Sequence, residues 1–124
     1  MDDYDGDPRW QPPAPEECDP EEVVPVDLTD TARITQRFLR SEGRLVDYAI
    51  ILEVLRDGEW TEAAKIDCAH SEVHFHQRRQ NGRHTRTVFM PIRSQEDVED
   101  SVQASVDLMF DEFDAYIGRW TFGH

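Results

Sequence analysis

The sequence predicts an α+β domain, in which a five-stranded antiparallel β-meander packs against one long C-terminal helix and a disordered acidic tail precedes both. Three observations indicate this architecture. Short apolar runs alternate with turn residues from residue 32 to residue 90. One apolar stripe at helical spacing then continues to residue 120. Residues 1–30 hold six of the seven prolines and 11 of the 27 acidic residues. With 124 residues, the chain has room for one domain.

Residues 1–30 are expected to form the extended, disordered tail. Their single basic residue is Arg9, and they contain few large apolar side chains. Such a segment buries too little surface to offset the entropy lost when its backbone becomes ordered. Its candidate anchors are Trp10, Val23, Val24 and Val26. The tail either keeps the domain soluble or acts as an acidic arm toward the protein's own basic surface or a partner. We therefore place the folded domain at residues 31–124.

Five strands are expected near residues 33–40, 45–56, 59–68, 72–79 and 84–90. The turns between them are Ser41-Glu42-Gly43, Asp57-Gly58, Ala69-His70-Ser71 and Asn81-Gly82. Asp-Gly and Asn-Gly are strong hairpin signals because both central residues of a type I′ turn need a positive φ. The order of short strands and tight turns is typical of an antiparallel meander.

A two-residue loop at Asn81-Gly82 would decide which side chains share a face of the sheet. The resulting pairs are Arg78 with Thr85, His76 with Thr87 and His74 with Phe89, and Val88 and Met90 join the face of Val73 and Phe75. Val73 and Phe75 then belong to the core. His74, His76 and Arg78 are expected to project away from it, toward solvent or a partner surface.

The expected strand at residues 45–56 carries apolar side chains on both faces. One helix covers only one face of a sheet, so the other face needs a second cover. This cover is either the valines of the tail or a second subunit. A homodimer is therefore one of the two arrangements that we expect.

A helix is expected to begin after Ser94. Ser94 and Asp97, three residues later, resemble a capping box, and acidic residues crowd the first turns, where the helix dipole favours negative charge. The apolar stripe of this helix consists of Val98, Val102, Val106, Met109, Phe113, Ile117 and Trp120. It is expected to pack on the sheet.

Residues 65–86 contain four of the five histidines, which suggests a metal site. His74 and His76 share a strand face because alternate strand residues point to the same side. The third ligand would come from His70, Glu72 or Asp67, and such a set suits a divalent ion such as zinc or manganese. The alternative is that the two imidazoles merely support strand packing or titrate near neutral pH.

Cysteine chemistry is not expected. Cys18 and Cys68 are too few and too far apart for a disulfide framework, and we interpret both as reduced thiols. No nucleophile motif surrounds Cys68, which is better explained as a small buried apolar residue.

The charges of the second half of the chain are strongly segregated. Residues 76–93 contain five arginines and no acid, whereas residues 94–114 contain eight acids and no base. Guanidinium groups on a projecting β-ribbon could bind phosphates or an acidic protein, or they could neutralise the acidic helix or tail. The candidate partner-binding residues are Arg78, Arg79, Arg83, His84 and Arg86. A net charge of −14 opposes strong non-specific DNA binding.

A membrane-bound or secreted protein is not expected. The start of the sequence lacks a basic segment followed by an apolar one, and no apolar run approaches the roughly 20 residues that cross a bilayer. We therefore expect a cytoplasmic protein with no membrane partner. Gly-rich phosphate loops, redox CxxC pairs and zinc-finger spacings are also absent from the sequence, which argues against several enzyme classes.

The segment Lys65-Ile66-Asp67-Cys68-Ala69-His70, followed by Val73-His74-Phe75-His76, resembles a pattern of small uncharacterised bacterial proteins. The pattern has an aspartate, one residue, alanine and histidine, then a histidine pair, with hairpin strands before it and a helix after it. Over roughly residues 33–90 the chain is also similar to TumE-type toxins of toxin–antitoxin modules, which carry more consecutive histidines and an asparagine at the position of Cys68. The resemblance implies a small accessory or toxin-like protein whose matching positions are Asp67, His70, His74 and His76.

Two functions are consistent with these observations, and whether the protein is an enzyme stays open. The first is a bacterial interaction protein, a toxin–antitoxin-like accessory that binds an acidic protein or a nucleic acid through the histidine- and arginine-rich ribbon. The second is a metal-dependent hydrolase or nuclease, in which His74 and His76 bind the ion, Glu72 or Asp67 completes the site and Arg78 orients a phosphate.

Overall fold

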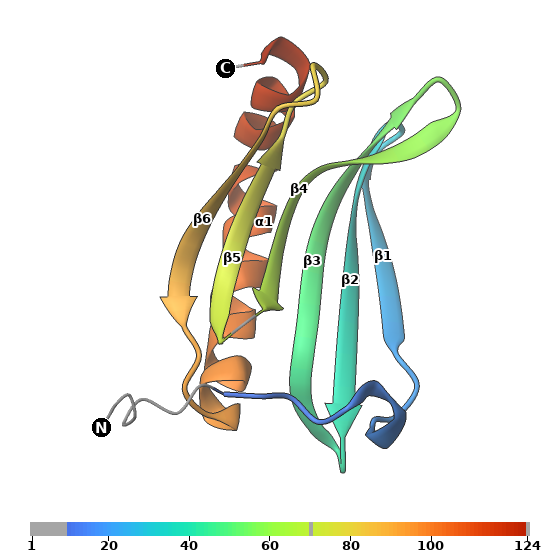
Figure 1. Ribbon diagram of the computed structural model, residues 1–124. Coiled ribbons are helices and arrows are strands. Elements are labelled where there is room, and N and C mark those ends of the chain that lie inside the picture. The colour runs from blue at the N-terminus through green and yellow to red at the C-terminus, as the bar shows by residue number, and fades with distance from the viewer. Residues whose placement is uncertain (1–9, 70, 124) are drawn as a thin grey trace.

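A six-stranded antiparallel sheet and a single long helix make up the two layers of the protein (Figure 1). The computed structural model describes residues 10–69 and 71–123. The strands are β1 Glu22–Thr29, β2 Ala32–Ser41, β3 Arg44–Arg56, β4 Glu59–Ala69, β5 Glu72–Arg78 and β6 His84–Pro91, and they are followed by helix α1 Gln95–Phe122. The strands are ordered in the sheet as they are in the sequence. The predicted α+β meander with one C-terminal helix is therefore confirmed.

The number of strands was predicted wrongly, because β1 lies inside the segment that was expected to be disordered. Val24 and Val26 of β1 pair with Gln36 and Ile34 of β2. Acidic residues and Pro25 obscured this strand in the sequence, but an outer strand tolerates a proline where no ladder hydrogen bond is needed. The domain therefore begins before residue 31. The part of the tail prediction that concerns residues 1–9 lies outside the described residues.

Residues 10–21, the N-terminal strap, run across one end of the sheet toward β1 (Figure 1). The Ser71 hydroxyl donates a hydrogen bond to the Trp10 carbonyl at 2.8 Å, and the Asp19 N–H donates to the Arg40 carbonyl at 2.8 Å. The strap contains a short 3-10 turn at Pro15–Glu17. It thus links Ser71, just before β5, with the end of β2.

The core lies between α1 and the face of the sheet that meets it. Its fully buried members include Ile34, Ile50, Leu52 and Ile66 from the strands and Met109 from the helix. Each buried aliphatic side chain of this size contributes about 1.5–3 kcal/mol relative to exposure. The Tyr48 hydroxyl lies 2.8 Å from the Ser101 hydroxyl and 3.0 Å from that of Ser105, so polar groups also join the sheet to the helix.

Both ends of α1 are capped, and the cap at the N-terminus is the predicted one. The Ser94 hydroxyl accepts a hydrogen bond from the Asp97 N–H at 3.3 Å, and Gly123 ends the helix at φ 73°. The helix follows the predicted stripe, since Val98, Met109 and Trp120 are buried. Although α1 is long, none of the helices in the described ranges combines the length and the apolar character that a membrane span requires.

The register between β5 and β6 differs from the prediction. The Arg79 N–H donates to the Arg83 carbonyl at 3.0 Å, so the connection spans residues 79–83 rather than Asn81-Gly82 alone. The Gln80 N–H donates to the carbonyl of Trp120 at 3.1 Å, which ties this longer connection to the end of α1. The observed pairs are Phe75 with Thr87, His76 with Arg86 and His74 with Val88, with a bulge between Val73 and His74.

The shifted register changes the position of Val88 but not that of the β5 side chains. Val88 is 52% exposed and pairs with His74, so the expectation that it joins the core is wrong. Val73 is fully buried, and the Phe75 ring lies 4.8 Å from the Tyr116 ring of α1. His74 and His76 therefore lie on the face of the sheet turned away from α1, which we call the open face.

Candidate metal centre on the open face

Three potential metal ligands converge on neighbouring strands of the open face. Asp67 on β4 pairs with His74 on β5, and His76 follows two residues later on the same side. One ligand atom from each of the three residues lies within 4.8 Å of the other two. The β4–β5 register therefore supplies the carboxylate that the two histidines needed. His70, another ligand suggested by the sequence, lies outside the described residues.

The three side chains are largely shielded from water, so of the two expected surroundings of the histidines, solvent or a partner surface, solvent is the wrong one. The exposed fractions are 3% for His74, 12% for His76 and 20% for Asp67. Their neighbours explain this burial, since Glu72 contacts the His74 ring and the His84 ring stacks on His76 at a centroid distance of 5.2 Å. Water therefore has little access to this part of the open face.

Each histidine has a hydrogen-bond partner outside the group of three. The Glu72 carboxylate accepts from Nε2–H of His74 at 3.0 Å, which leaves Nδ1 of His74 with a lone pair. His76 contacts Asp67 Oδ1 through Nε2 at 3.1 Å and His84 Nε2 through Nδ1 at 3.0 Å. Partial burial and the positive charge of Arg78 lower the pKa of His84, which favours the neutral ring, whose Nε2 can accept a hydrogen bond from Nδ1–H of His76.

This geometry fits a divalent ion. Ligand atoms placed about 2.0–2.2 Å from zinc at tetrahedral angles stand about 3.4 Å apart, and the Asp67–His76 contact of 3.1 Å is already close to that separation. Metal-binding histidines usually donate their second N–H to an outer partner, a role open to Glu72 for His74 and to His84 for His76. In such a site Asp67 would be the third ligand, and Glu72 would support His74.

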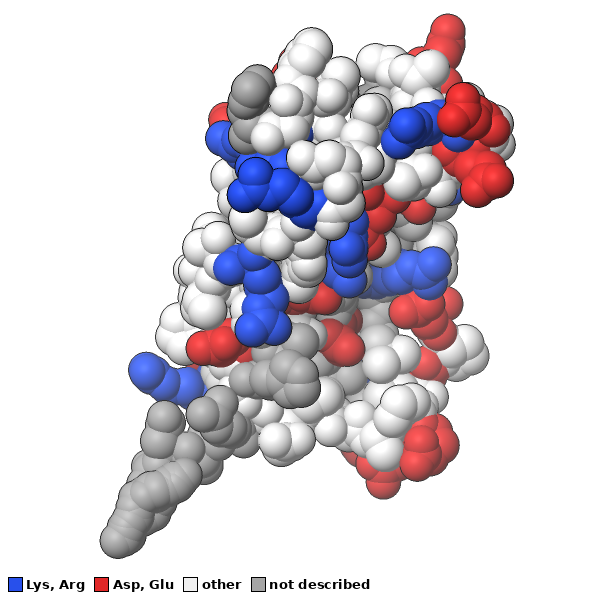
Figure 2. Space-filling model, turned by 45° about the horizontal axis from the view of Figure 1, so that its top comes forward, with Lys and Arg blue, Asp and Glu red and all other residues white. Residues whose placement is uncertain are grey.

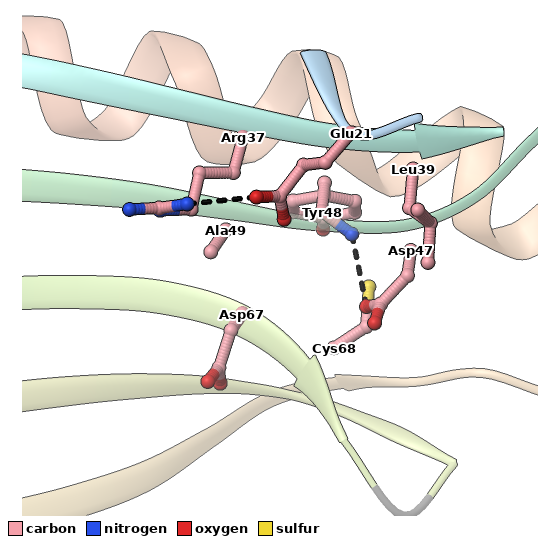
Figure 3. A pocket seen from close by; sticks show the side chains of 8 residues that line it. All are labelled: Glu21, Arg37, Leu39, Asp47, Tyr48, Ala49, Asp67 and Cys68. Atoms are coloured by element: carbon pink, nitrogen blue, oxygen red, sulfur yellow. Dashed lines mark hydrogen bonds and ion pairs between the residues drawn. The ribbon is translucent and has the colours of Figure 1, made fainter. Parts of the chain in front are cut away.

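A hollow of about 140 Å³ opens beside this group and shares Asp67 with it (Figure 3). Its walls include Glu21 from the strap, Arg37 from β2 and Asp47 from β3. Ala49 lies directly opposite Asp67 in the sheet, and its small side chain leaves this space open. The Glu21 carboxylate holds the Arg37 guanidinium at 2.7 Å, as Figure 3 shows.

Asp47 and Cys68 are the titratable groups of the hollow with the clearest shifts. Burial, together with the charges of Asp67 and Glu21, raises the pKa of Asp47 to about 6, although its carboxylate accepts the Tyr48 N–H at 2.9 Å. Burial also raises the pKa of Cys68 to about 12, so the thiol stays protonated near neutral pH, in agreement with the prediction that it is no nucleophile.

Sequence reasoning missed the hollow and its acid. An aspartate between Val46 and Tyr48, in a mostly apolar strand, was the available signal for Asp47. Arg37 and Glu21 carried no comparable signal, because Glu21 was assigned to a disordered tail and the position of Arg37 depends on the β2–β3 register.

The residues of the predicted basic ribbon differ in their contacts. Arg78 contacts Glu62 through Nε at 2.5 Å, and His84 contacts His76, so each already has one side-chain partner. Arg79 is half-buried, whereas Arg83 and Arg86 are exposed. Figure 2 shows lysine and arginine side chains gathered on the β5–β6 side of the molecule. The acidic strap pairs instead with Arg37 of β2, and Glu22 of β1 pairs with Arg40.

Comparison with known proteins gives a family without an assigned activity. A family model described as a domain of unknown function, DUF7718, matches residues 19–124. No curated protein and no solved structure matches the chain. The matched region includes β1 and the whole of the candidate metal centre.

Proposed function

The chain belongs to the DUF7718 family, and we propose that it is a hydrolase that depends on a divalent metal ion held by Asp67, His74 and His76. The observation that supports this proposal most strongly is the convergence of three ligand atoms within 4.8 Å on a shielded part of the sheet. Catalytic zinc sites commonly use three protein ligands of these types and leave a fourth position for water. A zinc or manganese ion would suit the set.

The bound ion would lower the pKa of a water molecule and polarise the bond to be cleaved. Glu72 and His84 orient the two histidine rings through the contacts at 3.0 Å. Asp47, with a pKa of about 6, can hold or release a proton at the wall of the adjoining hollow near neutral pH.

We assign the substrate to the phosphodiester class, which makes the protein a nuclease. Glu62 fixes the Nε of Arg78, and the remaining guanidinium nitrogens can point at a phosphate oxygen. Arg78 pairs with His84 in the sheet and lies on the same face as His76, two residues away. This arrangement brings a phosphate-binding group next to the proposed ion.

Metal content tests the site directly. Full-length protein dialysed against zinc or manganese should retain about one equivalent of the ion, measured by elemental analysis. Asp67→Asn should lose it, because an amide oxygen is a poor ligand for these ions. Asp57→Asn, the same change on the exposed β3–β4 turn, is the matched control and should bind normally. Equal metal content in both variants would contradict the assignment.

Activity tests the reaction. The zinc- or manganese-loaded protein should cleave single-stranded RNA or DNA, lose this activity with a chelator, and be inactive as His74→Ala. Hydrolysis that persists in the chelator would refute metal dependence. Iron retention with oxygen-dependent chemistry would point to the other use of a two-histidine, one-carboxylate set and would also refute hydrolysis.

An interaction role is a second candidate, which the exposure of Arg83 and Arg86 and the resemblance of residues 67–76 to TumE-type toxins favour. In this case the protein is a toxin–antitoxin-like accessory that binds an acidic protein or a nucleic acid. Binding should weaken steeply with salt, because exposed charges are screened. Affinity that is insensitive to salt would argue against this role. Homodimerisation and a cytoplasmic location stay predictions.

A further inference from the structure

The two outer strands of the sheet differ in their capacity to pair with another strand. Every outer strand presents unpaired backbone N–H and C=O groups along its free edge. β1 carries Pro25 at its centre, and a proline offers no N–H and disrupts pairing. β6 has a proline only at its last residue, and all its side chains except that of Met90 are exposed. β6 is therefore the edge open to strand addition.

The outward backbone groups of β6 can be assigned from its hydrogen bonds. Because the Arg79 N–H donates to the Arg83 carbonyl, Arg83 faces β5, and residues alternate in direction along an antiparallel ladder. His84 and Arg86 therefore direct their N–H and C=O groups away from the sheet. An added strand would form hydrogen bonds at these residues.

The two sides of this edge have different chemistry. On the open face, Arg86 pairs with His76 and His84 pairs with Arg78, and among the residues that the structure describes no acidic side chain contacts Arg83 or Arg86. On the other side, a hollow of about 410 Å³ lies between β6 and α1. Its mainly apolar walls include Phe75, Phe89, Leu108 and Tyr116, and the charged Asp111, Glu112 and Arg119 of α1 also line it. Figure 1 shows β6 at the margin of the sheet with α1 behind it.

We propose that β6 binds an extended segment of a partner protein as a seventh strand, and that this segment alternates acidic residues facing Arg86 with apolar residues entering the hollow beside α1. This inference rests on the proposed interaction role and specifies its partner. Backbone hydrogen bonds supply affinity in such strand addition, and alternate side chains supply specificity. Arg86 on one side of the edge would bind the acidic residues of the segment, and the hollow on the other side would bind its apolar residues.

Two other occupants fit the edge less well. A second copy paired through antiparallel β6 strands would bring Arg86 of each copy near its equivalent, and like charges across a strand pair are destabilising. A nucleic acid would use the arginines but not the apolar hollow or the outward backbone groups. An acidic and apolar strand uses all three features.

A short acetylated peptide of alternating glutamate and valine is the probe for this inference. Calorimetry with the full chain should show saturable binding of this peptide and none of a lysine–valine peptide. Arg86→Glu should weaken binding of the glutamate peptide by at least about tenfold and allow the lysine peptide to bind. Arg56→Glu, on an exposed residue at the end of β3, is the matched control and should leave binding unchanged.

Hydrogen exchange separates strand addition from simple charge attraction. Saturating glutamate–valine peptide should slow hydrogen exchange of the Arg86 amide. This measurement uses the unaltered protein, so its result does not depend on whether a variant folds. Unchanged exchange, or no saturable binding, would overturn the inference. Oligonucleotide binding that depends on Arg86, without peptide binding, would overturn it while leaving the interaction role intact. Dimers lost in Arg86→Glu would instead identify a second copy as the occupant.

Discussion

Asp47 illustrates how the environment of one side chain decides its chemistry. Burial raises the pKa of Asp47 from 3.8 to about 6, so the folded protein binds this proton more tightly than the unfolded chain does. Asp47 therefore lowers the free energy of unfolding once its carboxyl is ionised. This destabilisation is absent below about pH 4 and develops fully as the pH rises past about 6.

Asp47→Asn should accordingly stabilise the protein at high pH. A shift of this size corresponds to about 3 kcal/mol, and partial solvent screening reduces the expected gain in the free energy of unfolding to about 1–2 kcal/mol. Urea unfolding at about pH 8 and about pH 4 measures it, and the gain should appear only at the higher pH. An equal change at both values would show that the ionisation of Asp47 is not its cause.

At the level of single residues, the sequence identified the two histidines of the candidate metal centre but not which carboxylate accompanies them. His74 and His76 share a face in any straight strand, so their relation follows from strand periodicity alone. Asp67 joins them because it pairs with His74 across β4 and β5. That register depends on the connection between β4 and β5, which the sequence marks only weakly. Asp67 and Glu72 therefore remained alternatives until the strands were aligned.

At the level of elements, the predicted and observed structures differ where a long-range contact overrides a local signal. Asn81-Gly82 is a strong local signal for a two-residue loop. The Asn81 side chain accepts the Arg83 N–H at 2.9 Å, however, and the Gln80 N–H bonds to the end of α1. These contacts stabilise the longer connection. Similarly, the valines of β1 favour a strand, but Pro25 and the acidic residues around it hid this signal, and the strand forms against the edge of β2.

The contact between β3 and α1 gives a prediction at this scale. The buried Tyr48 hydroxyl joins β3 to Ser101 and Ser105, so Tyr48→Phe should reduce the free energy of unfolding by about 1–2 kcal/mol. The Ser105 hydroxyl would lose its partner, whereas the Ser101 hydroxyl still donates to the Val98 carbonyl at 3.0 Å. Tyr116→Phe is the control, since no described residue hydrogen-bonds to that hydroxyl and its loss should cost less. Chemical denaturation compares the two variants. Equal losses would mean that the hydroxyl network does not couple the layers.

At the scale of the whole molecule, positive and negative charges are concentrated on different elements of the fold. The net charge of −14 conceals a basic β5–β6 hairpin, an acidic helix, and an acidic strap whose Glu21 pairs with Arg37 of β2. The exposed Arg86 is left on the margin of the sheet, on the same side as the candidate metal centre, because it pairs with His76. A ligand that approaches this side therefore meets positive charge on an otherwise acidic protein.

The candidate centre also predicts a coupling between metal binding and the stability of the whole fold. Asp67 and His74 belong to adjacent strands in the interior of the sheet, so an ion that bridges them binds the folded chain and not the unfolded one. An ion present at about 100 times its dissociation constant stabilises the fold by about 2.7 kcal/mol. For a domain of this size, that corresponds to a rise in Tm of about 10 °C.

Thermal melts with and without zinc therefore report on the site without any substrate. Asp67→Asn should abolish the rise, because only one side of the bridge would remain, whereas Asp57→Asn should preserve it. Magnesium should produce little change, since nitrogen ligands suit it poorly. If zinc raised the Tm of Asp67→Asn as much as that of the unaltered protein, the ion would be bound elsewhere, and the open-face hydrolase would lose its structural basis.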